Sequence, residues 1–117
     1  MLSIKKVVTS AMLVLVASFA TAISADEVQL AQLTDGFDAE ATYMASCFAC
    51  HSTGAAGAPK VGPGNADDWA ARLEKGRDTV LANAINGINA MPAKGLCFSC
   101  TDEDLAALLD YMVDSSK

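Results

Sequence analysis

The chain has 117 residues, of which 52% are apolar, with four cysteines, one histidine and a formal net charge of −6. This length fits a single domain and excludes a multidomain enzyme, a large parallel-sheet fold and a polytopic membrane protein. All fourteen acidic residues follow Ala25, whereas two of the eight basic residues precede it. Such acidity disfavours nucleic acid and anionic lipid and favours a partner with a basic docking face, although it also keeps a small exported protein in solution.

Residues 1–25 have the order of a secretory signal peptide, in which two lysines precede an apolar run and small residues close the segment. Cleavage after Ala22 or after Ala25 fits the small-residue rule. An uncleaved anchor is the alternative, because residues 7–25 approach the length of a short membrane helix. The five serines and threonines in that span favour the signal. We therefore expect a periplasmic protein, with no stable membrane insertion of its mature form.

Residues 26–36 lack a clear hydrophobic period and are predicted to be a flexible lead-in to one domain over 37–117. The first helix is predicted at 37–47, where early acidic residues suit the positive end of the helix dipole. Glycines and prolines over 52–65 predict a loop, and the side chain of Asn65 is expected to cap the next helix.

Two short helices are predicted at 67–75 and 78–86, each followed by a glycine that ends it. Residues 88–100 contain proline and glycine and are predicted to be a loop. The last helix is predicted to begin at a cap formed by Thr101, and its apolar residues over 105–112 follow the helical period. Since no segment alternates with period two, the predicted fold class is all-α.

Cys47, Cys50 and His51 stand in the C-x-x-C-H order of covalent haem attachment. Two thiols one helical turn apart reach the two vinyl groups on one porphyrin edge, and the adjacent imidazole then lies over the iron as an axial ligand. The alternatives are a thioredoxin-like pair, a plain disulfide, and a four-cysteine zinc site with Cys97 and Cys100. The first needs a βαβ context, the second leaves the histidine unexplained, and the third needs a shorter spacing. One covalent haem c is therefore predicted, and it would fill a thin core.

The second axial ligand follows from a count of residues. His51 is the only histidine, so methionine is the usual alternative on the other side of the iron. Two of the five methionines lie in the predicted signal peptide, and Met44 and Met112 are interpreted as packing residues of helices. Met91 precedes Pro92 in a loop where no amphipathic pattern accounts for it, and it is predicted to be the sixth ligand.

Cys97 and Cys100 are followed by Thr101 rather than by histidine, so they do not form a second haem site. In an exported protein the default is a disulfide, which here closes a small loop before the last helix. The alternative is an exchange-active dithiol, because the dipole at a helix N-terminus lowers a thiol pKa.

A family resemblance rests on four short segments, which are residues 47–51, 57–60, 90–92 and 97–105. Together they resemble the c5-type branch of the class I c-type cytochromes over about 37–116, and the paired cysteines after the methionine loop are the most specific part. The resemblance implies a class I cytochrome c fold, with four to five short helices wrapped around one covalent haem. It also implies that the first and last helices pack together near Tyr43 and Tyr111.

The resemblance assigns further roles around the haem. It implies that the carbonyl of Pro59 accepts the ring N–H of the axial histidine and so fixes its tautomer. Trp69 and Arg72 would contact the haem propionates, with core packing as the alternative for Trp69. Ala93 stands where many relatives have a second proline, and no change of ligand is expected from this. The implied axial ligands are His51 and Met91, and the implied disulfide joins Cys97 and Cys100.

The sequence thus favours an exported, soluble carrier of single electrons in a bacterial respiratory chain, and not an enzyme. Two strong ligands leave the iron no open position for O₂ or peroxide. Expected partners are redox proteins with a basic docking face: an oxidase, a reductase or another cytochrome. Two rival interpretations are a haem-based peroxidase or gas sensor, in which Met91 dissociates readily, and a thiol–disulfide exchange protein that uses either cysteine pair.

Overall fold

The computed structural model describes residues 32–117, so the predicted signal peptide and most of the predicted lead-in lie outside the described residues. Within this range the backbone is helical and forms no strand beyond one isolated bridge between Ile88 and Met91. The all-α prediction is confirmed. The helices are α1 (Ala39–Ser46), α2 (Phe48–His51), α3 (Ala66–Leu73), α4 (Arg77–Asn86) and α5 (Asp102–Asp114), with a short 3-10 helix, η1 (Ala55–Gly57).

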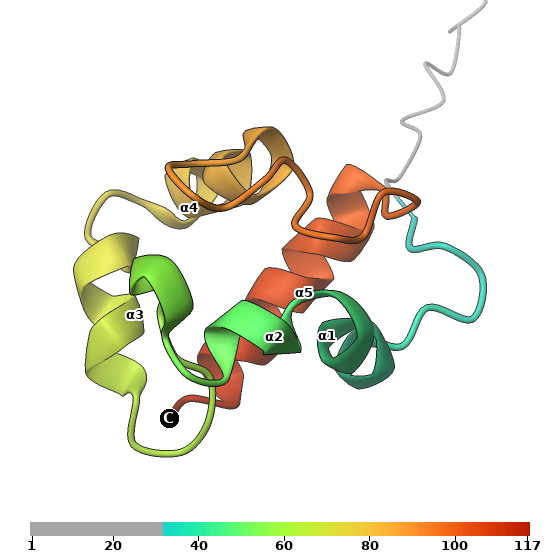
Figure 1. The fold of residues 1–117 in the computed structure, drawn as a ribbon. Coiled ribbons are helices and arrows are strands. Elements are labelled where there is room, and N and C mark those ends of the chain that lie inside the picture. The colour runs from blue at the N-terminus through green and yellow to red at the C-terminus, as the bar shows by residue number, and fades with distance from the viewer. Residues whose placement is uncertain (1–31) are drawn as a thin grey trace, which may run out of the picture.

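Helix α5 is the central element, and Figure 1 shows it running diagonally between α1 and α4, both of which pack against it. Its start is fixed by the predicted cap. The hydroxyl of Thr101 accepts from the Asp104 N–H at 3.1 Å, and the Asp104 carboxylate accepts from the Thr101 N–H at 3.0 Å. These reciprocal bonds satisfy two backbone donors that a helix start otherwise leaves open.

The crossing of α1 and α5 carries the two tyrosines that the resemblance places there. The rings of Tyr43 and Tyr111 have centroids 5.7 Å apart, and Phe48 meets Tyr43 edge to face at 6.0 Å. Helix α1 begins at Ala39 rather than at 37, because the Asp38 carboxylate accepts the backbone N–H of the first turn and thereby caps the helix. First and last helices are thus joined by aromatic packing.

Two expectations from the sequence are wrong. Asn65 occupies the cap position of α3, but its amide donates to the carbonyl of Gly62 at 2.8 Å and makes no bond to the helix. Its backbone (φ −107°, ψ 19°) lacks the extended conformation that would aim the side chain at the first turn. Met44 does not pack in the core, because its side chain is 53% exposed while neighbouring Tyr43 occupies the buried face of α1.

The last residues of the predicted lead-in are bound to α5. The backbone N–H and the hydroxyl of Thr34 donate to the two carboxylate oxygens of Asp104, at 2.9 and 2.6 Å. The carbonyl of Thr34 accepts from the N–H of Phe37 at 2.9 Å, which closes the turn before α1. Asp104 is only 1% exposed whereas Thr34 is exposed, so these bonds join a buried carboxylate to a surface residue. The same carboxylate therefore caps α5 and anchors the start of the described chain.

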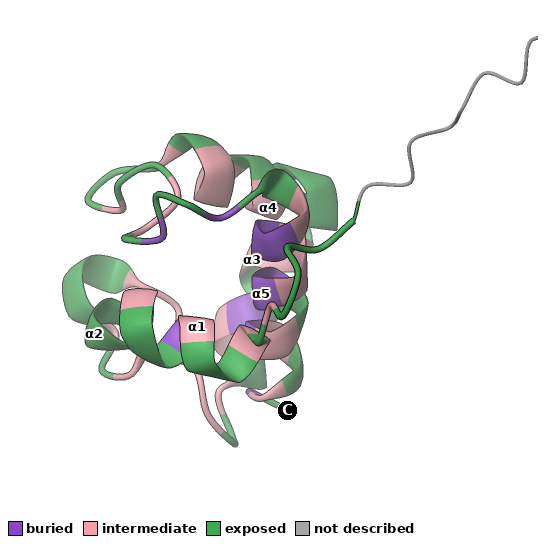
Figure 2. Cartoon of the chain, turned by 90° about the vertical axis from the view of Figure 1, so that its right-hand side faces the viewer, coloured by how far each residue is buried: buried purple, intermediate pink, exposed green. Residues whose placement is uncertain are grey.

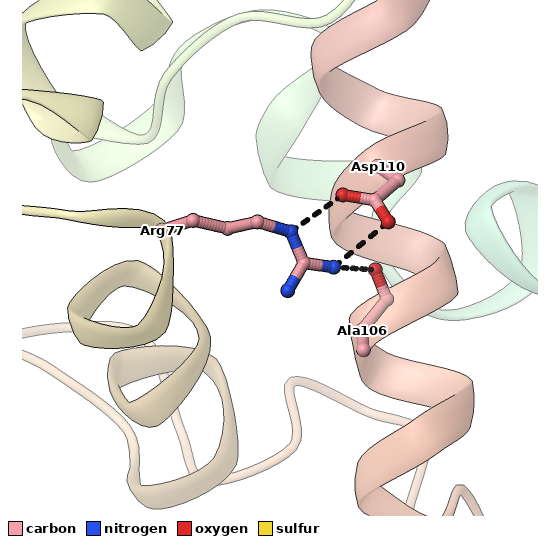
Figure 3. A network of polar contacts seen from close by, with 3 residues as sticks. All are labelled: Arg77, Ala106 and Asp110. Carbon is pink, nitrogen blue, oxygen red and sulfur yellow. Dashed lines mark hydrogen bonds and ion pairs between the residues drawn. The ribbon is translucent and has the colours of Figure 1, made fainter.

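A surface ion pair joins α4 to α5 (Figure 3). The guanidinium of Arg77 donates to both carboxylate oxygens of Asp110 at 2.8 Å and to the carbonyl of Ala106 at 3.2 Å. The two charged side chains are 41% and 57% exposed, which places the pair in the class worth at most about 1 kcal/mol. The pair therefore contributes little to the stability of the fold.

Buried positions gather on α5, as Figure 2 shows, whereas α4 contains no fully buried residue. The apolar core is small for a chain of this length, and most of its members also line the cavity described below. The buried apolar residues are Tyr43, Trp69, Cys97, Cys100, Leu105, Leu108, Leu109 and Met112.

Candidate haem-binding site

A cavity of about 510 Å³ lies among α2, α3, α4, α5 and the loop after α4. Its size falls in the range of roughly 300–1,000 Å³ that is typical of small-molecule and cofactor pockets. Leucines of α5 form an apolar wall. The cavity brings together all the residues predicted to contact haem or iron, which are Cys47, Cys50, His51, Pro59, Trp69, Arg72 and Met91.

The two cysteines of the attachment motif lie on the cavity wall as free thiols, with Cys47 half-buried and Cys50 exposed. Cys47 ends α1, and its backbone turns there so that α2 leaves in a new direction. Burial, and secondarily the neighbouring Cys50, raise the pKa of the Cys47 thiol to about 11. Such a thiol is protonated at neutral pH, whereas disulfide exchange needs a thiolate. This disfavours Cys47 as the attacking thiol of a disulfide exchange.

His51 is buried, with its ring Nδ1 2.8 Å from the carbonyl oxygen of Pro59. A carbonyl can only accept, so Nδ1 carries the proton and Nε2 keeps a lone pair for a metal. Burial lowers the pKa of His51, the Pro59 bond opposes this, and the charge of Arg72 adds to the lowering. The neutral imidazole is the form that ligates metals. The intervening loop is closed because the Val61 N–H donates to the carbonyl of His51 at 2.8 Å.

Trp69 and Arg72 reach the cavity from α3 in different ways. The indole of Trp69 stacks on the His51 ring with centroids 6.1 Å apart and planes 18° from parallel. Its single N–H donates to the carbonyl of Lys60 at 2.8 Å, so the structure favours the packing role over a propionate contact. The guanidinium of Arg72 is held at the wall by the carbonyl of Gly57 at 3.0 Å and keeps further N–H donors for a carboxylate.

Met91 is presented by a tight turn after α4. The N–H of Met91 donates to the Ile88 carbonyl at 2.9 Å, and the Ile88 N–H donates to the Met91 carbonyl at 3.0 Å. Met91 is half-buried and lines the cavity. Met112 of α5 also lines it, whereas Met44 does not. The structure thus leaves two methionine sulfurs at the wall, one on a loop and one in the core.

The base of this turn depends on a glycine. Gly87 has φ +83°, and a Cβ placed there would come within 2.8 Å of the Ala93 nitrogen and 2.9 Å of the Met91 oxygen. These are backbone atoms that cannot rotate away, so Gly87 and the 91–93 backbone are in direct contact. A glycine ending α4 was expected from the sequence, but this close approach was not.

Cys97 and Cys100 lie away from the cavity and are joined by a disulfide that packs against the core. Their loop is closed by a bond from the Cys100 N–H to the Cys97 carbonyl at 3.1 Å. Across residues 32–117 no three histidine, cysteine or carboxylate side chains converge as a metal site, so the structure gives the zinc hypothesis no support.

No pattern in the sequence predicted that Asn83 of α4 and Lys94 of the following loop line the cavity. Asn83 lies on a helix whose polar and apolar faces are weakly separated, and Lys94 is an ordinary loop lysine by sequence. The only available hint was the position of Lys94, three residues after Met91.

The residues present fit a c-type haem. Two free thiols stand one turn apart beside an imidazole whose Nε2 is unprotonated, an apolar wall faces them, and a guanidinium stands at the edge. None of the helices within the described range has the length and apolar character needed to cross a bilayer.

Comparison with known proteins identifies the family. Residues 35–112 match the family described as cytochrome c oxidase, cbb3-type, subunit III. The chain is 47% identical over 66 residues to cytochrome c5 of Ectopseudomonas mendocina, covering 56% of this chain and 76% of that relative. It is 44% identical over 87 residues to cytochrome c-555 of Chlorobaculum thiosulfatiphilum, covering 71% of this chain and 99% of that relative.

Its fold is also similar to a chain in the solved structure described as an electron transfer complex of nitrite reductase with cytochrome c. The TM-score is 0.60 at 35% identity, covering 74% of this chain and 100% of that chain. These relatives agree with the haem attachment motif and with the cavity that brings its residues together. The chain belongs to the class I c-type cytochromes, in the cytochrome c5-like branch, and is an electron-transfer protein that carries covalently attached haem c.

Proposed function

We propose that this cytochrome is a one-electron carrier of a bacterial respiratory chain, exported to the periplasm, with His51 and Met91 as the axial ligands of its haem iron. The observation that carries the proposal is the bond from His51 Nδ1 to the Pro59 carbonyl at 2.8 Å, inside the cavity that Met91 also lines. It leaves Nε2 as the ligating atom and fixes the plane of the ring.

Cys47 and Cys50 would attach the cofactor. Each S–H adds across one vinyl C=C to give a thioether, so no atom is lost and no oxidant is consumed. The bound haem supplies an iron that alternates between Fe(II) and Fe(III), and a methionine thioether raises its potential by favouring the ferrous state. The protein orients the ligands, keeps water from the apolar wall, and presents Arg72 to a propionate.

Export is supported by the order of residues 1–25, with cleavage proposed after Ala22 or Ala25. Residues 37–117 would then form the monohaem domain, with 26–36 as its lead-in. A disulfide between Cys97 and Cys100 is consistent with an oxidising compartment, where such bonds persist.

Partners are redox proteins, and we infer that their docking faces are basic. The chain carries fourteen acidic residues against eight basic ones, and attraction between opposite charges speeds encounter without a long-lived complex. Docking would be brief and would weaken as salt is added. The structural neighbour in complex with a nitrite reductase supports a redox enzyme as one class of partner.

Replacement of Met91 tests the ligand assignment. In Met91→Ala the haem should stay attached, as the spectrum in alkaline pyridine reports, because both thioethers are untouched. The sulfur-to-iron charge-transfer band of the ferric protein should disappear, since its donor atom is gone.

Met112→Leu serves as the control, because Met112 also lines the cavity and leucine conserves its volume. This variant should keep the charge-transfer band. Survival of the band in Met91→Ala, with its loss in Met112→Leu, would assign Met112 as the ligand and reject the proposal.

A further inference from the structure

Lys94 lies three residues after Met91, is half-buried, and lines the same cavity. Its side chain does not end in solvent as that of a loop lysine usually does, because the ammonium donates to the carbonyl of Cys100 at 2.8 Å. We propose that Lys94 is a positioning residue that holds the 88–96 loop against the body of the protein and so keeps Met91 at the iron. The inference rests on the proposed ligation by Met91.

The backbone of Lys94 provides two further anchors. Its N–H donates to the carbonyl of Ala84 in α4 at 2.8 Å, and its carbonyl accepts from the Cys97 N–H at 3.0 Å. Its φ is +60°, a left-handed conformation that side chains with a Cβ rarely adopt. Such a conformation persists only where surrounding contacts enforce it. Three hydrogen bonds at one strained residue meet that condition.

The ammonium connects the loop to a rigid point. Cys100 is 5% exposed, belongs to the disulfide, and directly precedes Thr101, the cap residue of α5. Hydrogen bonds from a charged donor are stronger than neutral ones, and partial burial protects this one from water. Lys94 therefore joins the 88–96 loop to α4 through its backbone and to the start of α5 through its side chain.

Apart from the Lys94 N–H, no backbone group of the 88–96 loop makes a hydrogen bond to a helix of the described residues. The loop's other backbone bonds are internal, between Ile88 and Met91 and between Gly95 and Pro92, and they shape the turn without fixing it to a helix. If the Lys94 bonds open, Met91 can leave the cavity as part of an intact turn. Carbon monoxide binding to the reduced holoprotein reports this opening, because an external ligand binds only when the methionine has left.

The test compares three variants of the holoprotein. Lys94→Asn removes the ammonium, while asparagine tolerates positive φ and is too short to reach the Cys100 carbonyl. Lys94→Arg keeps the charge and the reach. Lys75→Asn is the charge control, because Lys75 lines the same cavity and its side chain has no hydrogen bond to any residue of 32–117.

Carbon monoxide should bind Lys94→Asn about tenfold faster than the parent, which corresponds to about 1.4 kcal/mol in loop opening. Lys94→Arg and Lys75→Asn should stay within about twofold of the parent, a difference of roughly 0.4 kcal/mol. In Lys94→Asn, the charge-transfer band should disappear at a lower denaturant concentration than in the parent. The denaturant concentration at which the helical circular dichroism disappears should change less. Lys94→Gly, which accepts any φ, repeats the test if the asparagine variant folds poorly.

Equal rates in Lys94→Asn and Lys75→Asn would overturn the inference, because charge alone would then explain any change. A different result would show that the ligand proposal itself is wrong. If Met91→Ala keeps its charge-transfer band, Met91 is not the ligand. If Met91→Ala loses the band and Lys94→Asn binds carbon monoxide at the parent rate, the ligation stands and only the role of Lys94 is rejected.

Discussion

At the scale of single residues, Gly87 allows the backbone of the methionine turn to approach the end of α4 closely. In Gly87→Ala the new Cβ would lie 2.8–2.9 Å from backbone atoms of Met91 and Ala93 and would also occupy φ +83°. We expect the free energy of unfolding to fall by about 3 kcal/mol, from the sum of left-handed strain and overpacking. Guanidinium denaturation followed by circular dichroism measures the change.

Gly64→Ala is the matched control for this substitution. Gly64 has almost the same φ, +82°, but nothing lies within 4 Å of a Cβ built on it. This variant should lose only the conformational part, about 1 kcal/mol, and should keep its charge-transfer band unchanged. Equal losses in the two variants would show that the contact with the methionine turn has no energetic consequence.

Asp104 makes the stability dependent on pH. Burial alone would raise the pKa of this carboxyl, but hydrogen bonds from Thr34 and Thr101 outweigh it and hold the pKa below its ordinary value. A depressed pKa stabilises the fold above the unfolded-state pKa of about 3.9, and this contribution is lost as pH falls through the folded-state value. Asp104→Asn should therefore cost about 1–2 kcal/mol at pH 7 and progressively less below about pH 4.

Denaturant titrations at several pH values check this expectation, with Asp102→Asn as the control. Asp102 is an exposed acid in the same first turn, and the hydrogen bonds of Thr34 to α5 go to Asp104 instead. At pH 7 it should show only a small effect, of about 0.5 kcal/mol, from the helix dipole. A penalty in Asp104→Asn that stays constant from pH 7 to pH 3 would contradict the linkage.

At the scale of elements, the sequence correctly predicted the features that depend on residues close together along the chain. The cap at Thr101, the glycine that ends α4 and the all-α class all follow from short-range patterns, and the structure confirms them. Asn65 was misjudged because its amide binds Gly62 in the preceding turn, a choice that spacing does not reveal. The ion pair of Arg77 and Asp110, which lie 33 residues apart, had no local pattern to predict it (Figure 3).

The residues of the candidate site also fall into those that a local sequence pattern predicts and those that it does not. Its attachment cysteines and histidine follow from one contiguous motif, and the bond to Pro59 was implied by family resemblance alone. The stacking of Trp69 on His51 and the anchoring by Lys94 depend on how distant segments meet, so no local pattern encodes them. Met44 was predicted to pack in the core from its place on the first helix, but the helix turns it to solvent.

At the scale of the whole molecule, the small apolar core predicts that folding depends on the cofactor. Helices α2 to α5 all line one cavity, and five of the eight buried apolar residues line it as well. In a Cys47→Ser/Cys50→Ser variant made without attached haem, we expect most of the helical circular dichroism to be lost. The holoprotein in the same buffer is the control. Native-like helical content in the haem-free variant would contradict the prediction.

The two walls of the cavity are closed by separate sets of bonds. On one wall, Pro59 and Val61 bind back to His51, while on the other the 88–91 turn closes on itself and is tied outward through Lys94. No hydrogen bond in either set involves an atom from the opposite wall. Local unfolding can therefore release the methionine wall as an independent cooperative unit, while the wall that bears the histidine and the covalent attachment stays folded. Amide hydrogen exchange in this cytochrome would accordingly have two timescales, and the faster would belong to the wall formed by the 88–91 turn.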